Sequence, residues 1–507
     1  MATDDPDLAE HAERYRTLRR TLEADILPLA TSLDGRAFRL QAPVGLSLRT
    51  GGYVTLETPD GPLLGQVVDY DLTLEEGPQI SGSAGPTSLT TALRFSRGAG
   101  HGVVMGDAAP FHDAPMRPAE PREVGEWMAR AARPRARLRI GEALHAPGVP
   151  VELDAGGFDR HTFLCGQSGS GKSYSLGVVL EQLLLETDLR IVILDPNSDC
   201  ARLPVVRPGA DRALAARWRD LAPGIAVRAA ADDGTGSLHM GFFGLDARIK
   251  AAVAGLDPVR DRQEYGTLLD LVADQAAGRP LDELLELLSS GSDEERALGT
   301  RIRNLGLLDW SVWSRGRDGR GLLEDLDADD WRCLVVDLGS LPSAEERTLV
   351  AASALKRLWQ RRGDRRPVLV VIDEAHNVCP QAPADALGRL ATDMAVRIAA
   401  EGRKFGIYLL VSTQRPQKVH ENVLSQADNL ILMRMNSSGD LAYLAGLFSF
   451  VPPSLIEEAA GLRLGEAVVA GKVTPYPVLA RIGGRVAEEG GGDVPASWAR
   501  PAGADPR

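Results

Sequence analysis

The eight residues GQSGSGKS, Gly166 to Ser173, constrain the fold of this 507-residue chain more than any other feature. They match the pattern G-x-x-x-x-G-K-[ST], which is meaningful only between an apolar strand and a helix. The apolar run TFLCG precedes the loop, and the helical run SYSLGVVLEQLLL follows it. The sequence therefore predicts a phosphate-binding loop that joins a buried strand to a helix.

The residue types of this loop suit a nucleotide with a magnesium ion. Glycines let backbone N–H groups turn toward phosphate oxygens, and the positive end of the following helix points at them. We expect Lys172 to reach the β and γ phosphates and the Ser173 hydroxyl to bind Mg²⁺. ATP and Mg²⁺ are thus the predicted cofactors, held by Gly166, Gln167, Ser168, Gly169, Ser170, Gly171, Lys172, Ser173 and Tyr174.

A second apolar strand, in VLVVIDEAH, ends in two carboxylates. Asp373 at its end would hold the magnesium ion beside the phosphate loop. Glu374 would accept a proton from the attacking water. For this run taken alone, the alternative is a strand end exposed to solvent. Together with the phosphate loop, the run predicts ATP hydrolysis.

A third strand, GIYLLVSTQRP, ends in the polar residues Ser412, Thr413 and Gln414. Ligands gather at the carboxyl ends of parallel strands, so Gln414 is a candidate sensor of the water or the γ-phosphate. The alternative is that it caps the strand end. Arg403 precedes this strand and Arg160 precedes the loop strand; a guanidinium could stabilise transition-state charge, in the same subunit or across a subunit boundary.

From Ile140 onward, apolar strands alternate with helical segments, which predicts an α/β fold with a parallel sheet, a RecA-like P-loop NTPase core. Short alternating runs with turn signals predict a small N-terminal β-barrel. The expected divisions are an N-terminal helical extension 1–34, the barrel 35–110, a Pro/Arg-rich linker 111–148, the ATPase core 149–485 with a helical insertion at about 200–330, and a disordered tail 486–507.

Charge and composition limit the functions that this chain can have. The formal net charge of −13 excludes a broadly basic surface, although a ring can hold nucleic acid with a few cations in its channel, for which Lys404, Lys418 and Arg434 are candidates. The arginines spaced along 130–139 favour a solvated linker over phosphate contact. We find no pattern of a membrane-spanning segment or of a secretory signal in the sequence. The four cysteines lack the spacing of metal ligands. We therefore expect a cytoplasmic protein without membrane contact.

Taken in order, these segments resemble the HerA/FtsK family of hexameric DNA-translocating ATPases, on the HerA side. The resemblance covers about residues 38–483, through GGYVTLE…GPLLGQVVD, RHTFLCGQSGSGKS, VLVVIDEAHNV, EGRKFGIYLLVSTQRP, VLSQADNLILMRM and LGEAVVAG. It implies that Glu374 is the catalytic glutamate, Gln414 the sensor, Arg403 an arginine finger and Arg160 a second family arginine. One departure is DPNSDC, Asp195 to Cys200, where relatives often carry a DPHGEY-like run.

The resemblance implies a homohexameric motor that moves along double-stranded DNA, together with a nuclease or another effector. The alternative is a ring that acts mainly as scaffold or regulator of a bound nuclease or NAD-consuming effector in anti-phage defence. A third possibility, a nucleotide-gated switch, is disfavoured because a switch needs no general base at Glu374. The chain has no NKxD motif and no LSGGQ-like run, which argues against a GTPase and a transporter-type ATPase.

Overall fold

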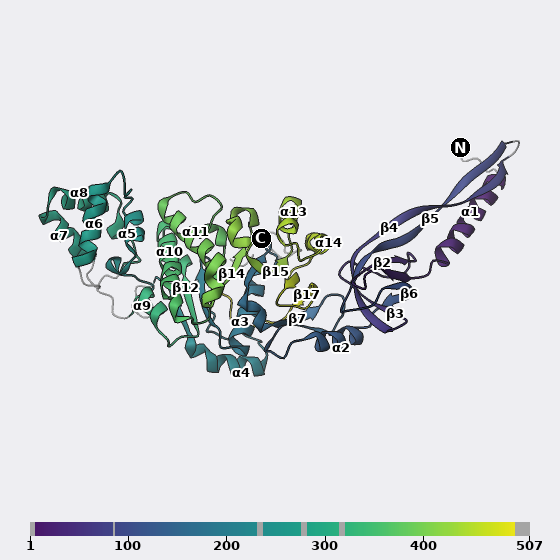
Figure 1. The fold of residues 1–507 in the computed structure, drawn as a ribbon, viewed down its shortest axis with the longest axis horizontal. Helices are drawn as coiled ribbons and strands as arrows, with labels where there is room; N and C mark the ends of the chain where they lie inside the picture. The colour runs from purple at the N-terminus through teal and green to yellow at the C-terminus, as the bar shows by residue number, and fades with distance from the viewer. Residues whose placement is uncertain (1–5, 85–86, 231–236, 275–280, 314–319, 492–507) are drawn as a thin grey trace, which may run out of the picture.

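The chain forms an elongated molecule with an α/β core between two projecting parts (Figure 1). The computed structural model describes residues 6–84, 87–230, 237–274, 281–313 and 320–491. A barrel with a long hairpin lies at one end of the core, and a group of short helices lies at the other. None of the described helices is long and apolar enough to cross a bilayer.

Six antiparallel strands near the N-terminus pair in a closed ring, in the order β1-β2-β5-β4-β3-β6. Pairing of β6 with β1 closes the ring, which leaves no free edge strand within the ring itself. Phe38, Leu40, Val54 and Leu56 fill its interior. The ring includes more of the sequence than the expected range 35–110, because its first and last strands lie outside that range. The strands are Leu29–Ser32, Ala37–Ala42, Tyr53–Thr58, Gly61–Ala84, Thr87–Val104 and Phe111–Pro118 for β1 to β6.

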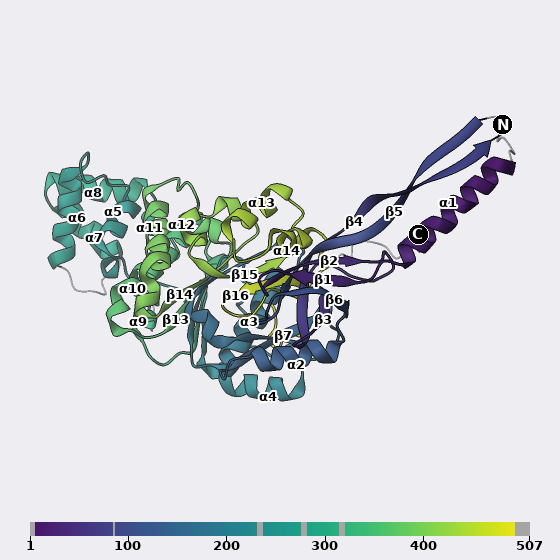
Figure 2. The same cartoon turned by 45° about the vertical axis from the view of Figure 1, so that its right-hand side comes forward.

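Strands β4 and β5 continue beyond the ring as a two-stranded arm, and helix α1 (Pro6–Ala24) lies alongside it (Figure 2). The Tyr15 hydroxyl accepts a hydrogen bond of 3.1 Å from the backbone N–H of Arg94. Glu23 accepts one of 3.0 Å from the N–H of Ser96. The helix expected within 1–34 is therefore present, shorter than that range, and fixed to the arm.

The residues expected to form a linker, 111–148, are regular structure instead. They hold β6, helix α2 (Pro121–Ala131) and strand β7 (Arg137–Ala143), which belongs to the core sheet. Pro121 opens α2, and Glu120 and Glu123 cap its first turn reciprocally. The prediction of a linker was wrong because the Pro and Arg content obscured an amphipathic helix whose Val124 is fully buried.

The core is one eleven-stranded sheet in the order β11-β12-β10-β13-β14-β9-β15-β16-β17-β7-β8. The seven strands from β11 to β15 are parallel, and the remaining four pair antiparallel. The expected α/β fold with a parallel sheet is thus present. The strands not yet given are β8 Pro150–Asp154, β9 His161–Cys165, β10 Arg190–Asp195, β11 Ile225–Arg228, β12 Cys333–Asp337, β13 Val368–Ile372, β14 Ile407–Thr413, β15 Ala427–Met433, β16 Glu466–Gly471 and β17 Val478–Ile482.

Helices cover both faces of the parallel part of the sheet. Successive strand residues point to opposite faces, so Ile191 and Ile193 pack in one core cluster and Val192 and Leu194 in another. This explains why the strands read as continuous apolar runs. The first face carries α3 (Lys172–Glu186) and α4 (Arg212–Leu221); the second carries α10 (Ala344–Gln360), α11 (Ala386–Glu401), α12 (Glu421–Leu424), α13 (Ser438–Leu447) and α14 (Pro453–Glu457).

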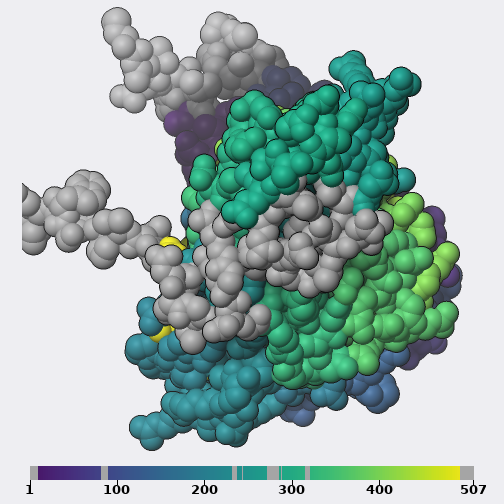
Figure 3. Space-filling view, turned by 90° about the vertical axis from the view of Figure 1, so that its left-hand side faces the viewer, coloured from purple at the N-terminus to yellow at the C-terminus, as the bar shows by residue number. Residues whose placement is uncertain are grey.

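Much of the expected insertion is a group of helices at the end away from the barrel, shown in teal at the top of Figure 3. Its α5 packs against α10 and α11, which attaches the group to the core. Trp313 packs edge to face on Phe242 and is itself buried. The helices of this group are α5 Ala247–Val253, α6 Arg262–Asp274, α7 Leu281–Ser290 and α8 Asp293–Asn304, whereas α9 (Leu322–Asp327) packs against α10.

The last described residues are attached to the helix that follows the phosphate loop. Buried Glu181 of α3 accepts hydrogen bonds from Arg485 Nε at 3.0 Å and from the N–H groups of Val486 and Ala487 at 2.6 and 3.0 Å. The prediction of disorder from residue 486 is therefore wrong for 486–491, because this distant carboxylate holds the segment. The rest of the expected tail, 492–507, lies outside the described residues.

Candidate nucleotide site

The phosphate loop leaves the sheet at the end of β9 and enters α3 at Lys172. Gly169 and Gly171 have φ values of +69° and +91°, a left-handed conformation that residues with a Cβ rarely adopt. At Gly166 an added Cβ would come within 2.5 Å of the Met433 side chain. The glycines are therefore required by the path of the loop.

Lys172 contacts side chains at the carboxyl ends of the second and third predicted strands. Its Nζ is 2.8 Å from Asp373 Oδ1, 3.2 Å from Glu374 Oε1 and 3.2 Å from Ser412 Oγ. The amine is almost completely buried, which disfavours its charged form, but the two carboxylates raise its pKa. Residues far apart in sequence thus meet at the carboxyl end of the sheet, beside the phosphate loop.

Glu374 is held by three side chains in a strained backbone conformation. Gln414 Nε2 donates a hydrogen bond of 2.8 Å to its Oε1, and His376 Nδ1 lies 3.3 Å from its Oε2. Burial opposes ionisation, but His376, Lys172 and Gln414 together lower the pKa of Glu374 to about 2. Its φ of 41° and ψ of 51° are left-handed, and such strain in a residue other than glycine is concentrated at functional sites.

The run DPNSDC, which departs from the family pattern, lies against the same site. Asp195 accepts hydrogen bonds from the backbone N–H groups of Asn197, Asp199 and Cys200, and burial raises its pKa to about 7. Burial raises the pKa of Asp199, and the neighbouring Ser173 and Lys172 oppose that rise. Asp195 therefore shapes the loop, and the shorter acid Asp199 lies near the serine expected to bind magnesium.

Arg160 and Arg403 lie at the other end of the sheet. Arg160 directly precedes β9, and Arg403 lies in the short 3₁₀ turn Gly402–Phe405 before β14. Both contact Asp428: Arg403 NH1 at 3.2 Å and Arg160 Nε at 3.5 Å from Oδ2. At about 3.3 Å per residue, the seven residues of β14 separate Arg403 from the Gln414 end by roughly 20 Å. The structure brings the two arginines together, but away from Lys172.

Arg434, considered above for a channel, contacts the phosphate loop instead. Its NH2 donates to the Gly169 carbonyl at 2.9 Å, and its own carbonyl accepts from the N–H of Gln167 at 2.9 Å. Its Nε is buried and has no hydrogen-bond partner among the described residues. Arg434 and His376 were not predicted as residues of the nucleotide site, although Arg434 directly follows β15 and His376 lies four residues after the end of β13.

Tyr174, the last residue of the predicted nucleotide-binding segment, points toward the C-terminal segment. Its hydroxyl accepts hydrogen bonds from the Arg485 N–H at 2.8 Å and from Arg207 NH1 at 3.1 Å. The helix that carries Lys172 and Ser173 is therefore connected through Tyr174 to residues near the chain end.

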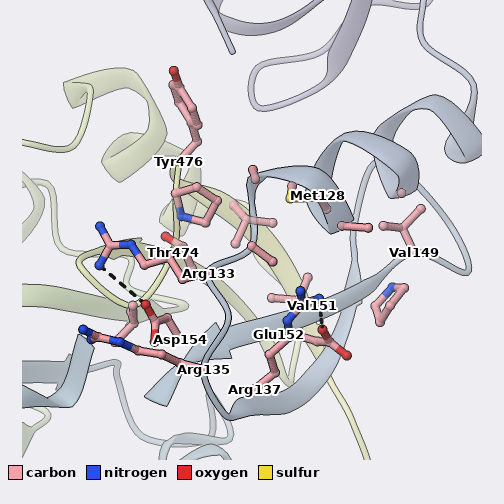
Figure 4. Close-up of a pocket in the computed structure, with 18 of the residues that line it drawn as sticks. Met128, Arg133, Arg135, Arg137, Val149, Val151, Glu152, Asp154, Thr474 and Tyr476 are labelled. Atoms are coloured by element: carbon pink, nitrogen blue, oxygen red, sulfur yellow. Dashed lines mark hydrogen bonds and ion pairs between the residues drawn. The ribbon is translucent and has the colours of Figure 1, made fainter. Parts of the chain in front are cut away.

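A cavity of about 500 Å³ lies apart from the phosphate loop, between α2, β8 and the turn after β16 (Figure 4). Arg133 lies 3.5 Å from Asp154, and Arg137 lies 3.1 Å from Glu152. Two arginines of the predicted linker are thus paired with carboxylates of this chain, which favours a structural role over phosphate contact for them.

Comparison with known proteins finds similarity to one family. Residues 138–216 match the family model described as "Helicase HerA, central domain". The chain is 26% identical to the DNA double-strand break repair helicase HerA of Pyrococcus furiosus, over 68% of this chain and 69% of that protein. It is 24% identical to the protein of the same name from Saccharolobus solfataricus, over 86% of this chain and 88% of that protein. These similarities confirm the resemblance found in the sequence.

Solved structures that match this chain include VirB4 of Thermoanaerobacter pseudethanolicus, with a TM-score of 0.49 and 14% identity over 70% of this chain and 98% of that one. The bacterial conjugative coupling protein TrwB has a TM-score of 0.45 and 15% identity, over 72% of this chain and 92% of that one.

Proposed function

We propose that this HerA-like P-loop ATPase hydrolyses ATP in a ring of identical subunits and uses the energy to move along double-stranded DNA. The observation that carries the proposal is that the predicted catalytic residues are divided between the two ends of the sheet. Lys172, Asp373, Glu374 and Gln414 meet at one end of the sheet, whereas Arg160 and Arg403 lie at the other. One copy therefore presents two incomplete halves of an ATP site.

The first half fits a nucleotide with magnesium. The described residues contain no cluster of three or more acidic, His or Cys side chains that would hold a metal alone. That suits Mg²⁺, which binds through few protein oxygens and the phosphates of its nucleotide. Ser173 and Asp373 are the proposed ligands, and Ser170 Oγ, buried without a hydrogen-bond partner among the described residues, could bind a phosphate oxygen. The bound ion would neutralise charge on the phosphates.

Glu374 is the proposed base that accepts the proton of the attacking water. Its carboxylate is ionised at neutral pH, since its pKa is about 2. Lys172 contributes to that low value, so the basicity of Glu374 would rise when the phosphates draw the lysine away. Gln414, which contacts Glu374, would orient the water between the base and the γ-phosphate.

The second half would serve a neighbouring subunit. A guanidinium roughly 20 Å along the sheet from the base cannot stabilise charge on the same nucleotide. We therefore infer that Arg403, with Arg160, acts across the subunit boundary as an arginine finger, which is worth about 10³–10⁵ in kcat where it has been measured. Six copies per ring is the number that the family resemblance implies.

DNA as the track is supported by the relatives, which are named DNA double-strand break repair helicases. With a net charge of −13, DNA contact would be restricted to a local cationic surface. A nuclease or other effector is the proposed partner. In the alternative, a scaffold or regulator of such an effector, the same ATP site would operate without movement on DNA. The HerA-type character of the barrel and the cytoplasmic location also stay predictions.

The test is ATP turnover by the purified full chain with and without double-stranded DNA. We expect turnover that depends on Mg²⁺ and rises several-fold with duplex DNA. Turnover that no duplex stimulates, whatever its length or ends, would contradict the motor and favour the scaffold. Lys172→Ala protein, assayed in parallel, gives the background of contaminating ATPases.

A further inference from the structure

We propose that Asp428 is a positioning residue, which holds Arg160 and Arg403 in place for the neighbouring ATP site. The inference rests on the proposed function, because it assumes that these arginines complete a site on another subunit. It assigns the organisation of that half-site to one residue of strand β15.

The evidence begins with the contacts of the Asp428 carboxylate. One oxygen, Oδ2, lies 3.2 Å from Arg403 NH1 and 3.5 Å from Arg160 Nε. Asp159 also contacts Arg160, at 3.1 Å, but among the ion pairs of the described residues only Asp428 joins the two arginines. A carboxylate between two guanidiniums offsets their mutual repulsion and lets them lie close together.

The backbone directs this side chain toward the arginines. In the pairing of β15 with β9, Ala427 lies opposite His161 and Asn429 opposite Thr162, so Asp428 is an extra residue in a β-bulge. A bulge changes the direction in which a side chain points, and bulges are frequent beside active sites. In a regular strand, Asp428 would occupy a position in the ladder beside β9.

Asn429 fixes the bulge from the inside. It is completely buried, and its amide nitrogen donates to the Gly157 carbonyl at 2.9 Å and to Thr162 Oγ1 at 3.0 Å. Its amide oxygen accepts from the N–H groups of Lys472 and Val473 at 2.8 and 3.1 Å. Both ends of the amide are satisfied, so the bulge is tied to β9 and to the turn that precedes Arg160.

Asp428 would matter for the placement of the two arginines rather than for the stability of the fold. All three side chains are about one third to two fifths exposed, and ion pairs of that kind contribute little to folding. Positioning, in contrast, has large effects on rate, since a displacement of about 1 Å can cost about a hundredfold. The arginines would exchange the carboxylate for phosphate oxygens when a neighbour's nucleotide meets them.

The experiment compares Asp428→Asn, Arg403→Ala and the double variant in steady-state ATP turnover, with assembly followed by size-exclusion chromatography. We expect Asp428→Asn to lower kcat about tenfold or more with KM for ATP nearly unchanged. The double variant should be slower than Arg403→Ala by much less than the factor that Asp428→Asn costs alone, because part of the effect of Asp428 acts through Arg403 and only the part through Arg160 remains. Asp188→Asn is the matched control, since Asp188 pairs with Arg332 near the same end of the sheet and touches neither arginine.

The outcomes separate the two proposals. A normal kcat for Asp428→Asn beside a strongly impaired Arg403→Ala would overturn the role of Asp428 and leave the proposed function standing. Multiplied effects in the double variant would also overturn it. A normal kcat for Arg403→Ala would instead overturn the proposed function. If Asp428→Asn fails to assemble, Asp428→Glu replaces it. A kcat of Asp428→Glu near the wild-type value supports positioning by the carboxylate, and a kcat that is not restored overturns the role of Asp428.

Discussion

Gln414 Nε2 donates a hydrogen bond of 2.8 Å to Glu374 Oε1, which joins the end of β14 to the residue after β13. Strand β14 lies between β13 and the loop strand β9, so Gln414 is placed between the acidic residues and the phosphate loop. This contact relates the proposed sensor directly to the proposed base.

Replacement of Gln414 by alanine should impair turnover more than ATP binding. The variant keeps Lys172 and the phosphate loop but leaves the water and the base without their orienting amide, so we expect kcat to fall about 10- to 100-fold. Steady-state kinetics and nucleotide titration measure the two effects. Gln417→Ala is the control, because Gln417 Nε2 donates to half-buried Asp440 and not to Glu374. Equal activity of the two variants would remove Gln414 from the mechanism.

Glu374→Ala should bind ATP and fail to hydrolyse it. Removal of the carboxylate takes away the proposed base and one of the two acidic contacts of Lys172, while Asp373 keeps the other at 2.8 Å. We expect turnover at background with ATP affinity within a few-fold of wild type. Unchanged turnover in this variant would show that another group accepts the proton.

Glu181→Ala should destabilise the protein through its C-terminal segment. The mutation leaves the Arg485 guanidinium, only about 1% exposed, without its main partner, and loss of one member of a buried pair typically costs about 3–5 kcal/mol. Chemical denaturation gives the free energy of unfolding. Glu186→Ala, on the same helix, removes a more exposed pair with Arg217 and should cost below about 1 kcal/mol. A similar cost for both variants would contradict the role of Glu181.

His161 should make stability depend on pH below neutrality. Burial, reinforced by the charge of Arg403, lowers its pKa to about 4, and its Nδ1 accepts the Leu409 N–H at 2.9 Å. The unfolded chain, with an ordinary histidine pKa near 6.5, then binds the proton more readily, so stability falls as pH decreases from about 6.5 to about 4. The loss is on the order of 3 kcal/mol at the lower end. His161→Asn should flatten this part of the profile, measured by urea unfolding; an unchanged slope would contradict the assignment.

The sequence was sufficient to predict the local parts of the site. The phosphate loop and the two polar strand ends are continuous motifs, and the rule that parallel strands end at one edge predicted that they meet. The rest depends on contacts between distant segments. The bulge at Asp428 is a property of strand pairing, and Glu181 gives no local sign that it holds residues 485–487. For α2, the capping pair Glu120 and Glu123 was a readable signal that composition obscured.

The central claim is that each ATP site takes its phosphate loop from one subunit and its arginine from the next. The most direct test mixes Lys172→Ala with Arg403→Ala, two variants that should each be inactive alone. After random assembly, about a quarter of the interfaces join an intact phosphate loop to an intact arginine, so ATP turnover should recover to a comparable fraction of wild type. A mixture as inactive as either variant, in rings shown to contain both, would contradict the account.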